Sequence, residues 1–425
     1  MKQDLNTRFL PEKTDRLTKA AKQFLSDYGV ISLLGESLGG LLANAAPEER
    51  FDVLLSACGF EKDPSGFFRA VRQWIHDRSV KGEPASVKLN NIKLPNLFLY
   101  HLLEVDDPGQ SLVNAKSSAR LAQATGFPFR DPKSIGKVID KYPVRLSSHV
   151  IRQSILSKAV AAQYLTFEDE LDSNGHDMTF DGHFKQGLME QMYRNRAIFL
   201  LDMRCPVYCR FCFRKHKSLR HEPSPSSEDV KKAVDRVRAD KAVKEILITG
   251  GEPLLNRKNL DAALSGLRSV DHVKTLRIAT RSLAYYPHLF LHHDRSLVSY
   301  LLDQQERCRK KGKRIEIGVH MVHPDEVSVQ TLELISQLTS NGIPVYVQTP
   351  FLKELNDRGD VLGRLFSLLR QAGAEIYYIF TPCHPIHGTQ KYWSPISLSM
   401  EAYAYLRAHT SDRAIPKLCT ATPLG

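Results

Sequence analysis

Short runs of apolar and β-branched residues alternate with longer amphipathic patterns through the second half of this chain. The runs lie at 197–203, 245–249, 275–280, 315–320, 345–349 and 375–380, and the helical patterns between them include 227–237, 259–268, 328–341 and 360–372. Strands that are separated in this way by helices pair in parallel, as βαβ units. Six such units predict an α/β fold, a partial barrel of the TIM type, whose chemistry lies where strands end and loops begin.

The rest of the chain shows a different pattern of apolar and polar residues. Residues 1–125 mix helical periodicity with turns, and we expect a mostly helical N-terminal region there, of unknown role. Residues 126–190 form a helical lead-in, interrupted by an acidic stretch at 168–175 that we interpret as a loop, and 191–425 form the barrel with a C-terminal extension. The glycines of 35–45 follow no convincing strand and precede no P-loop lysine, so we assign that stretch a structural role.

Composition and hydropathy indicate a soluble globular enzyme. The chain has 425 residues, of which 42% are hydrophobic and 25% are charged. No apolar run approaches the roughly 18 residues that a membrane span needs. The first residues are polar and lack the apolar core of a signal peptide, so we expect a cytoplasmic protein without a membrane partner.

The formal net charge of +12 raises the question of a nucleic-acid or acidic partner. The clearest basic run, 307–314, lies between a helical pattern and a strand pattern, which favours a solvated loop. No aromatic residues interleave it, as a single-strand binder would require. We therefore do not expect nucleic acid as a partner.

Three of the seven cysteines lie within eight positions, in the sequence RCPVYCRFCFRKH. An odd number of thiols in a chain of this length is no disulfide framework. Cys205, Cys209 and Cys212 follow the first barrel strand, and a C-x3-C-x2-C loop can turn three thiolates towards one point. Such a set suits zinc, with His216 as a fourth ligand, or an iron–sulfur cluster with one open iron.

A second motif, Gly250-Gly251-Glu252-Pro253, directly follows the next strand. Two glycines allow the backbone to approach a ligand closely and to adopt torsions that are closed to other residues. The carboxylate of Glu252 offers an acceptor for an ammonium group. One strand after the cysteine loop, this turn indicates a ligand site more strongly than an ordinary turn.

The cysteine loop, with Phe211 just before its last cysteine, resembles the signature of the radical S-adenosylmethionine (SAM) superfamily. The resemblance narrows to the lysine 2,3-aminomutase family through further matches. These run from Tyr142-Pro143-Val144-Arg145 through Arg277-Ile278-Ala279-Thr280-Arg281 and His320-Met321-Val322-His323-Pro324 to Ile415-Pro416. It implies a partial (β/α)6 barrel and reductive cleavage of SAM to a 5′-deoxyadenosyl radical that abstracts hydrogen from the substrate. It also implies an electron donor such as flavodoxin or ferredoxin, and a homo-oligomer is compatible with it.

The resemblance implies a role for individual residues of this sequence, matched one by one to the family's functional residues. Cys205, Cys209 and Cys212 match the ligands of a [4Fe-4S] cluster. Arg214 matches the arginine that grips the substrate carboxylate, a task that suits the paired donors of a planar guanidinium. The other implied contacts are Gly250, Gly251 and Glu252 at the SAM amino group; Arg277, Thr280 and Arg281 at its carboxylate or sugar; His323 and Gln348 in the SAM pocket; and Arg196 near the phosphate of pyridoxal phosphate (PLP), the second cofactor of family aminomutases.

Several positions depart from the family pattern, and all of them concern PLP or lysine. Met192 replaces the second phosphate-binding arginine, and no lysine follows Ala421, where the imine lysine is expected. The carboxylates that hold the distal amine of lysine align with Cys383 or His384 and with Ala421. Lys417 could be proposed as a substitute, but its strand-like neighbours favour a solvent-facing role. Losses this varied favour a protein that does not use PLP.

Three hypotheses follow. The first is a PLP-free radical SAM enzyme acting on an amino-acid-like, carboxylate-bearing small molecule. The second is a PLP-dependent aminomutase acting on free lysine or on a lysine of elongation factor P. The third is a non-catalytic, zinc-stabilised binding module. A second metal site at Cys383, His384 and His387 competes with a plain pocket wall, and free cysteine is often simply buried.

Overall fold

A computed structural model describes residues 11–29, 35–83, 86–172, 174, 185–215, 223–382, 384–385 and 388–421. The chain divides into two compact units. One contains the residues up to Glu168 together with Asp325–Val329, and the other contains Asp169–Pro324 and Gln330–Gly425. The division thus falls between the boundaries at 125 and 190 that we predicted. Among the described residues, no helix has both the length and the apolar character that crossing a membrane requires.

The first unit is mostly helical, as predicted for the N-terminal region. Apolar residues at helical spacing form its core: α1 buries Leu17, Ala21 and Phe24, and the Phe24 ring lies 5.2 Å from that of Phe98. Its elements are α1 Pro11–Tyr28, α2 Gly35–Ala43, α3 Arg50–Ala57, α4 Pro64–Val80, β1 Lys88–Leu89, β2 Ile92–Lys93, α5 Asn96–Asp106, β3 Leu112–Ala115, α6 Ser118–Thr125, α7 Pro132–Lys141, β4 Val144–Ser147, α8 Ser148–Leu156 and α9 Lys158–Tyr164. The glycine-containing stretch is helix α2, in keeping with a structural role.

The second unit contains a nine-stranded sheet in the order β13-β12-β11-β10-β9-β8-β7-β6-β5. Strands β7 to β13 pair in parallel, and the hairpin of β5 and β6 adds two antiparallel strands at one edge. The strands are β5 Lys185–Gln186, β6 Met189–Tyr193, β7 Arg196–Asp202, β8 Glu245–Gly250, β9 Thr275–Thr280, β10 Arg314–His320, β11 Val345–Pro350, β12 Glu375–Pro382 and β13 Lys417–Ala421.

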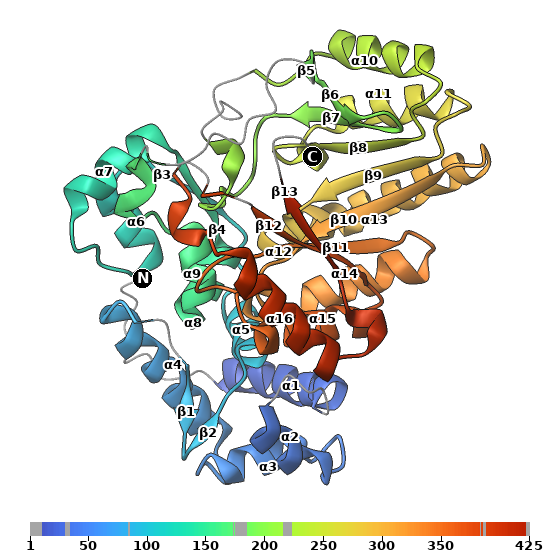
Figure 1. Cartoon of the computed structure of the whole chain (residues 1–425). Helices are drawn as coiled ribbons and strands as arrows, with labels where there is room; N and C mark the ends of the chain where they lie inside the picture. The colour runs from blue at the N-terminus through green and yellow to red at the C-terminus, as the bar shows by residue number, and fades with distance from the viewer. Residues whose placement is uncertain are drawn as a thin grey trace. The chain divides into compact units, whose positions relative to one another are not determined.

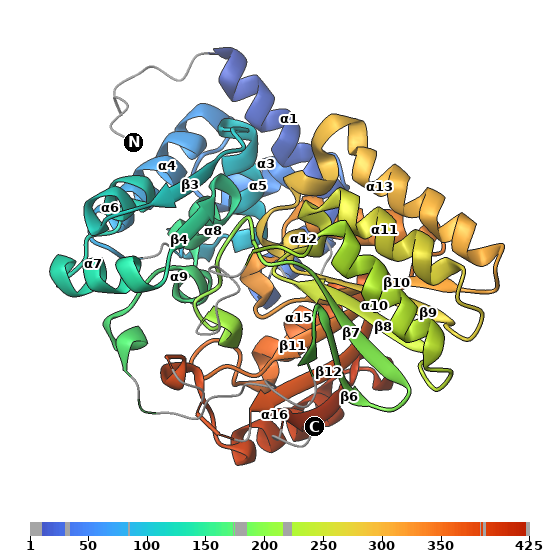
Figure 2. The ribbon, with the colours of Figure 1, turned by 90° about the horizontal axis from the view of Figure 1, so that it is seen from above.

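Helices connect the successive parallel strands, and these six βα units confirm the predicted partial barrel. Figure 1 shows α10, α11 and α13 following one another along the sheet, and Figure 2 shows the same strands from above. The helices are α10 Ser227–Ala239, α11 Arg257–Arg268, α12 Ser282–Tyr285, α13 His288–Arg309, α14 Val329–Ser340, α15 Gly359–Gln371 and α16 Ile396–His409. Short 3-10 turns are η2 Glu168–Leu171, η3 Phe213–Lys215, η4 Pro253–Leu255, η5 Pro324–Glu326, η6 Gln390–Tyr392 and η7 Asp412–Ala414.

Local sequence explains why these elements form where they do. In β8 every second residue is buried, so that Ile246 and Ile248 face the covering helices. Helix α10 starts at a capping box in which the Ser226 hydroxyl accepts the Asp229 N–H, while the Asp229 carboxylate accepts the Ser226 N–H. These signals are local, and the six predicted strands agree with the structure to within one or two residues at each end.

Two features differ from the sequence-based expectation. Strand β13 extends the parallel sheet beyond the six predicted strands, pairing with β12. The acidic stretch predicted as a loop contains the turn η2, and Glu170 within it is completely buried. The reason is that Glu170 neutralises two buried cations, which lie far away in the sequence.

Candidate functional site

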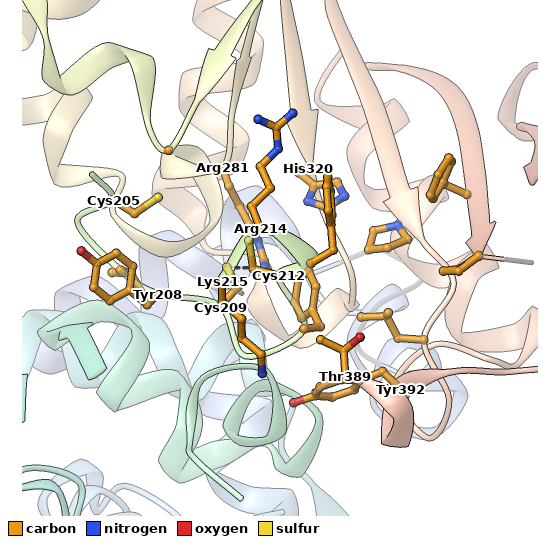
Figure 3. Close-up of a pocket in the computed structure, with 18 of the residues that line it drawn as sticks. Cys205, Tyr208, Cys209, Cys212, Arg214, Lys215, Arg281, His320, Thr389 and Tyr392 are labelled. Atoms are coloured by element: carbon orange, nitrogen blue, oxygen red, sulfur yellow. Dashed lines mark hydrogen bonds between the residues drawn. The ribbon is translucent and has the colours of Figure 1, made fainter. Parts of the chain in front are cut away.

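A cavity of about 260 Å³ opens at the carboxyl ends of the parallel strands of the second unit. Met203, Gly250, His320, Pro350 and Pro382 line it, and each belongs to or directly follows the end of a different strand. Of the predicted site residues, it brings together Cys205, Cys209, Cys212, Arg214, Gly250, Gly251 and Arg281. Figure 3 shows Cys209 and Cys212 near the middle of the view, Cys205 to their left, and Thr389 and Tyr392 below and to the right of them.

The two glycines hold the strand that leads into the cysteine loop. Gly251 donates its N–H to the Asp202 carbonyl at 2.6 Å, and Glu252 donates its N–H to the Arg204 carbonyl at 2.7 Å. A Cβ on Gly251 would lie 2.3 Å from that Arg204 oxygen. Gly250 has a φ of +131°, a conformation that side chains disfavour. The sequence predicted that the backbone of these glycines approaches a ligand closely. In the structure it closely approaches the protein's own backbone, just before Cys205.

A buried ion-pair cluster supports the cysteine loop from within. Glu170 accepts hydrogen bonds from Arg210 Nε at 2.9 Å and from Lys215 Nζ at 2.8 Å, and all three side chains are fully buried. Burial alone would raise the pKa of the Glu170 carboxyl, but the two cations outweigh it and hold the pKa below its ordinary value. Lys215 also donates to the Arg210 carbonyl at 2.8 Å, so the cluster fixes the backbone between the cysteines.

Arg281 directs its guanidinium at a cysteine of this loop. Its Nη1 lies 3.0 Å from Cys209 Sγ, and the guanidinium carbon lies 4.8 Å from the centre of the Phe211 ring. Arg281 is 6% exposed, so this charge acts on the sulfur with little screening by water. A hydrogen bond from a cation favours the thiolate form, which is the form that binds iron.

Glu252 does not line the cavity, although the sequence predicted it as an acceptor for SAM. Its Oε2 accepts the hydroxyls of Thr280 at 2.8 Å and Ser282 at 2.7 Å, and that of Tyr285 at 3.2 Å. Burial raises the pKa of the Glu252 carboxyl. The carboxylate therefore ties the turn after β8 to the end of β9 and to α12, and Thr280 is one of its donors.

The neutral polar groups of the cavity are kept neutral by burial. The pKa of His320 is lowered to about 3, chiefly by burial and secondly by the Arg281 charge. Burial likewise raises the pKa of Tyr285 and of Tyr392 well above the ordinary value for tyrosine. These groups can pack and donate hydrogen bonds, but they carry no charge at neutral pH.

Arg277, which was predicted to contact SAM, forms ion pairs within the barrel. It faces Glu316 directly across β9 and β10, and its Nη2 and Nε both lie 3.0 Å from Glu316 Oε2. A second carboxylate, Glu245, lies 3.1 Å from its Nη1. Arg277 is an ion-pair partner within the barrel and is not among the described cavity-lining residues, so its role as a SAM contact stays a prediction.

Arg196 also lies away from the cavity. It starts β7, at the end of that strand opposite to the cysteine loop, and its guanidinium carbon lies 3.8 Å from the ring centre of Tyr193. The side chain is exposed. His323 is 7% exposed and Gln348 is half-buried in β11, and neither lines the cavity. The family resemblance predicted on which strand or turn Arg196, His323 and Gln348 lie, but it did not predict how far they lie from the cysteines.

The residues present fit an iron–sulfur cluster. Three thiols share one cavity wall, one of them receives a cationic hydrogen bond, and the loop that carries them is anchored on both sides. Over the part of the chain that the structure describes, no three His, Cys, Asp or Glu side chains are grouped as ligands of a metal ion. His216, the fourth zinc ligand in the alternative hypothesis, lies outside the described residues, as do Cys383 and His387. His384 lines the cavity.

Sequence reasoning missed the residues that hold the site together. Glu170, Arg210 and Lys215 looked like ordinary charged loop residues, and nothing in the sequence pairs them. One signal was available: Arg210 lies between two cysteines of a loop that must pack closely, and a buried arginine requires a buried carboxylate. Phe380, Tyr392 and Trp393 also line the cavity, and they follow no motif.

Comparison with known proteins agrees with this geometry. Residues 203–362 match the model of the radical SAM superfamily. The L-lysine 2,3-aminomutase of Methanococcus maripaludis is 27% identical to this chain; the match covers 70% of this chain and 68% of that enzyme. The glutamate 2,3-aminomutase of Clostridioides difficile is also 27% identical, over 61% of this chain and 58% of its own. The chain therefore spans only part of the length of these relatives.

Among solved structures, a radical SAM methyltransferase from Sphaerobacter thermophilus is 15% identical over 56% of this chain and 69% of its own, with a TM-score of 0.36. That score is too low for the likeness to support any statement on function.

A cysteine loop after the first strand of a partial barrel, within a matching domain, defines a radical SAM protein. Within the radical SAM proteins, the sequence of this chain is 26% to 32% identical to those of several aminomutases. The chain contains a radical SAM domain, and its sequence is similar to those of enzymes named lysine or glutamate 2,3-aminomutase, which supports an enzyme of aminomutase type.

Proposed function

We propose that this protein is a radical SAM enzyme that abstracts hydrogen from an amino-acid-like, carboxylate-bearing substrate and acts without PLP. The observation that carries the proposal is the convergence of three cysteines, two turn glycines and two arginines on one cavity. When bound, the [4Fe-4S] cluster supplies one electron that breaks the sulfur–C5′ bond of SAM, giving methionine and a 5′-deoxyadenosyl radical that takes a hydrogen atom from the substrate.

The residues of the chain have separate tasks in this proposal. Cys205, Cys209 and Cys212 hold the cluster, and Arg281 supports the sulfur of Cys209. Gly250 and Gly251 allow the turn after β8 to pack against the backbone just before Cys205, beside the cavity where SAM would lie. Arg214 lines the cavity. Its guanidinium makes a long contact of 3.4 Å with Glu190 and lies 5.4 Å from the ring centre of Phe213, and its paired donors can bind a substrate carboxylate. The aromatic wall excludes water from the radical.

The residues do not fit PLP. An imine requires an available lysine amine, and Lys215, the only lysine among the described residues that line the cavity, is engaged with Glu170 and the Arg210 carbonyl. The matched phosphate arginine, Arg196, is exposed and lies over Tyr193. Met192 cannot pair with a phosphate. This set supports a reaction in which no imine is formed.

The test is reductive SAM cleavage by anaerobically purified protein. We expect 5′-deoxyadenosine to form with a chemical reductant or a flavodoxin- or ferredoxin-type donor, and a four-iron EPR signal. Cys212→Ala should abolish both. A colourless protein with bound zinc and no 5′-deoxyadenosine would refute the proposal.

The names of the relatives favour a second candidate, a PLP-dependent aminomutase. An absorbance band from added PLP that borohydride reduces onto the chain would support this second candidate. It would leave the radical chemistry in place and remove only the statement that no PLP is used.

A further inference from the structure

Apart from the cysteines assigned to the cluster, the charged side chains described in the cavity lining are all cationic. This inference rests on the proposed function and deepens it. Among the described cavity-lining residues, Arg214, Lys215 and Arg281 carry positive charge, and no aspartate or glutamate is present.

Two of the three cations already have partners. Lys215 is held by Glu170, and Arg281 points at Cys209. Arg214 remains, with its long contact of 3.4 Å to Glu190, which lies outside the cavity lining. The cavity can therefore bind one carboxylate well, and it offers no described carboxylate of its own to a cation.

Much of the cavity wall that the ends of β11 and β12 provide is apolar. Pro350 and Leu352 come from the end of β11 and the residues after it, and Phe380 and Pro382 from the end of β12. Trp393 completes this wall; its indole N–H donates to the Pro382 carbonyl at 3.2 Å. Its one polar hydrogen is thus engaged, and the ring presents carbon to the cavity.

We propose that the substrate is an amino acid or related carboxylate whose side chain is uncharged and apolar, and that the cavity discriminates against lysine. The carboxylate binds Arg214 and the side chain lies near the apolar wall. An ammonium group at the end of that side chain would lose its hydration, and no carboxylate among the described lining residues would receive it. Discrimination of this kind comes from the unpaired charge rather than from size.

The test uses two ligands of the same shape. L-2-aminoheptanoate has a methyl group where L-lysine has its ammonium, so the pair isolates the charge. Dissociation constants are measured by titration calorimetry with the full chain, reconstituted anaerobically and saturated with SAM. We expect L-2-aminoheptanoate to bind at least about tenfold more tightly than lysine. Equal affinities, a preference for lysine, or no saturable binding of L-2-aminoheptanoate at millimolar concentration would overturn the inference.

A pair of variants tests the cause. Leu352→Glu places a carboxylate on the apolar wall, and Leu352→Gln is the matched control of the same shape without charge. The glutamate variant should improve lysine binding relative to L-2-aminoheptanoate by about tenfold, and the glutamine variant should not. The same change in both variants would show that charge is not the cause. If either variant fails to fold, the two ligands on the unchanged protein still decide.

A second readout separates this inference from the proposed function. SAM cleavage without substrate reports the radical chemistry alone, and deuterium transfer from β-deuterated ligand into 5′-deoxyadenosine reports the substrate. Deuterium transfer from L-2-aminoheptanoate but not from lysine supports the inference. If 5′-deoxyadenosine forms but lysine is the better deuterium donor, only the substrate class is wrong. If none forms under any condition, the proposed function fails, and the binding preference still tests the cavity.

Discussion

The substitution Gly251→Ala tests whether the glycine turn positions the cysteine loop. The added Cβ would lie 2.3 Å from the Arg204 carbonyl oxygen, 2.7 Å from its carbonyl carbon and 2.9 Å from its nitrogen. These are backbone atoms, so no flexible side chain can move aside. Restoring an ordinary contact requires a displacement of about 1 Å. That displacement would move the strand that enters the loop at Cys205.

The energetic cost follows from two effects. Overpacking of this kind costs about 1–3 kcal/mol. The displacement also weakens the two hydrogen bonds of 2.6 and 2.7 Å that join the turn to Asp202 and Arg204, each worth about 1 kcal/mol. We therefore expect the free energy of unfolding to fall by about 3–5 kcal/mol. Iron bound per chain after reconstitution should fall as well, because Cys205 is moved.

The assay combines chemical denaturation with iron analysis, and Gly136→Ala is the control. Gly136 lies inside α7, where an added Cβ meets nothing within 4 Å, and the substitution should stabilise the chain by about 0.5–1 kcal/mol. If Gly251→Ala retains the parent's unfolding free energy and iron content, the argument that this close approach positions the cysteine loop is wrong.

Three further substitutions test the buried charges. Glu170→Gln should lower the free energy of unfolding by about 3–5 kcal/mol, because it removes the negative charge that pairs with two buried cations. Since these cations hold the pKa of Glu170 below its ordinary 4.5, the parent protein should lose stability as the pH falls below that value. A denaturation series across pH should show that this loss is missing from the variant. Arg281→Gln should lower the reduction potential of the cluster, because a cation that donates to Cys209 Sγ stabilises the more negative reduced state. An unchanged midpoint potential in an EPR-monitored redox titration would contradict this prediction. Arg277→Met should lower stability by about 1–3 kcal/mol, because the 2% exposed Glu316 keeps only the largely exposed Arg314 as its partner, 2.5 Å away. The affinity for SAM should stay the same; a loss of SAM affinity at unchanged stability would instead support the predicted SAM contact.

Much of the fold could be predicted because its signals are local. The alternation of buried and half-buried residues in β8 and β9 is written in the sequence, and the predicted strands lie where the structure has them. Strand β13 was not predicted, because its five residues form a strand only by pairing with β12. Turn η2 looked like a loop, because burial of Glu170 depends on cations about forty residues away.

The site was predictable in part for the same reason. The cysteines and glycines are short motifs directly after strands, and parallel strands end at one edge of the sheet. Arg277 shows where this reasoning stops: its partner Glu316 lies directly opposite on the neighbouring strand, and only the register of two strands far apart in the sequence makes them a pair.

The sequence by itself determined the order of strands and helices, the cysteine loop, the glycine turn and the family resemblance. Each of these depends on residues close together along the chain. The tertiary structure decided which charges are paired and which side chains reach the cavity. Glu252 bonds to Thr280 and Ser282 instead of lining the cavity, Arg281 meets Cys209, and much of the wall at the ends of β11 and β12 is apolar. Such contacts join distant segments, and burial makes each charge depend on its neighbours in space rather than on those in sequence.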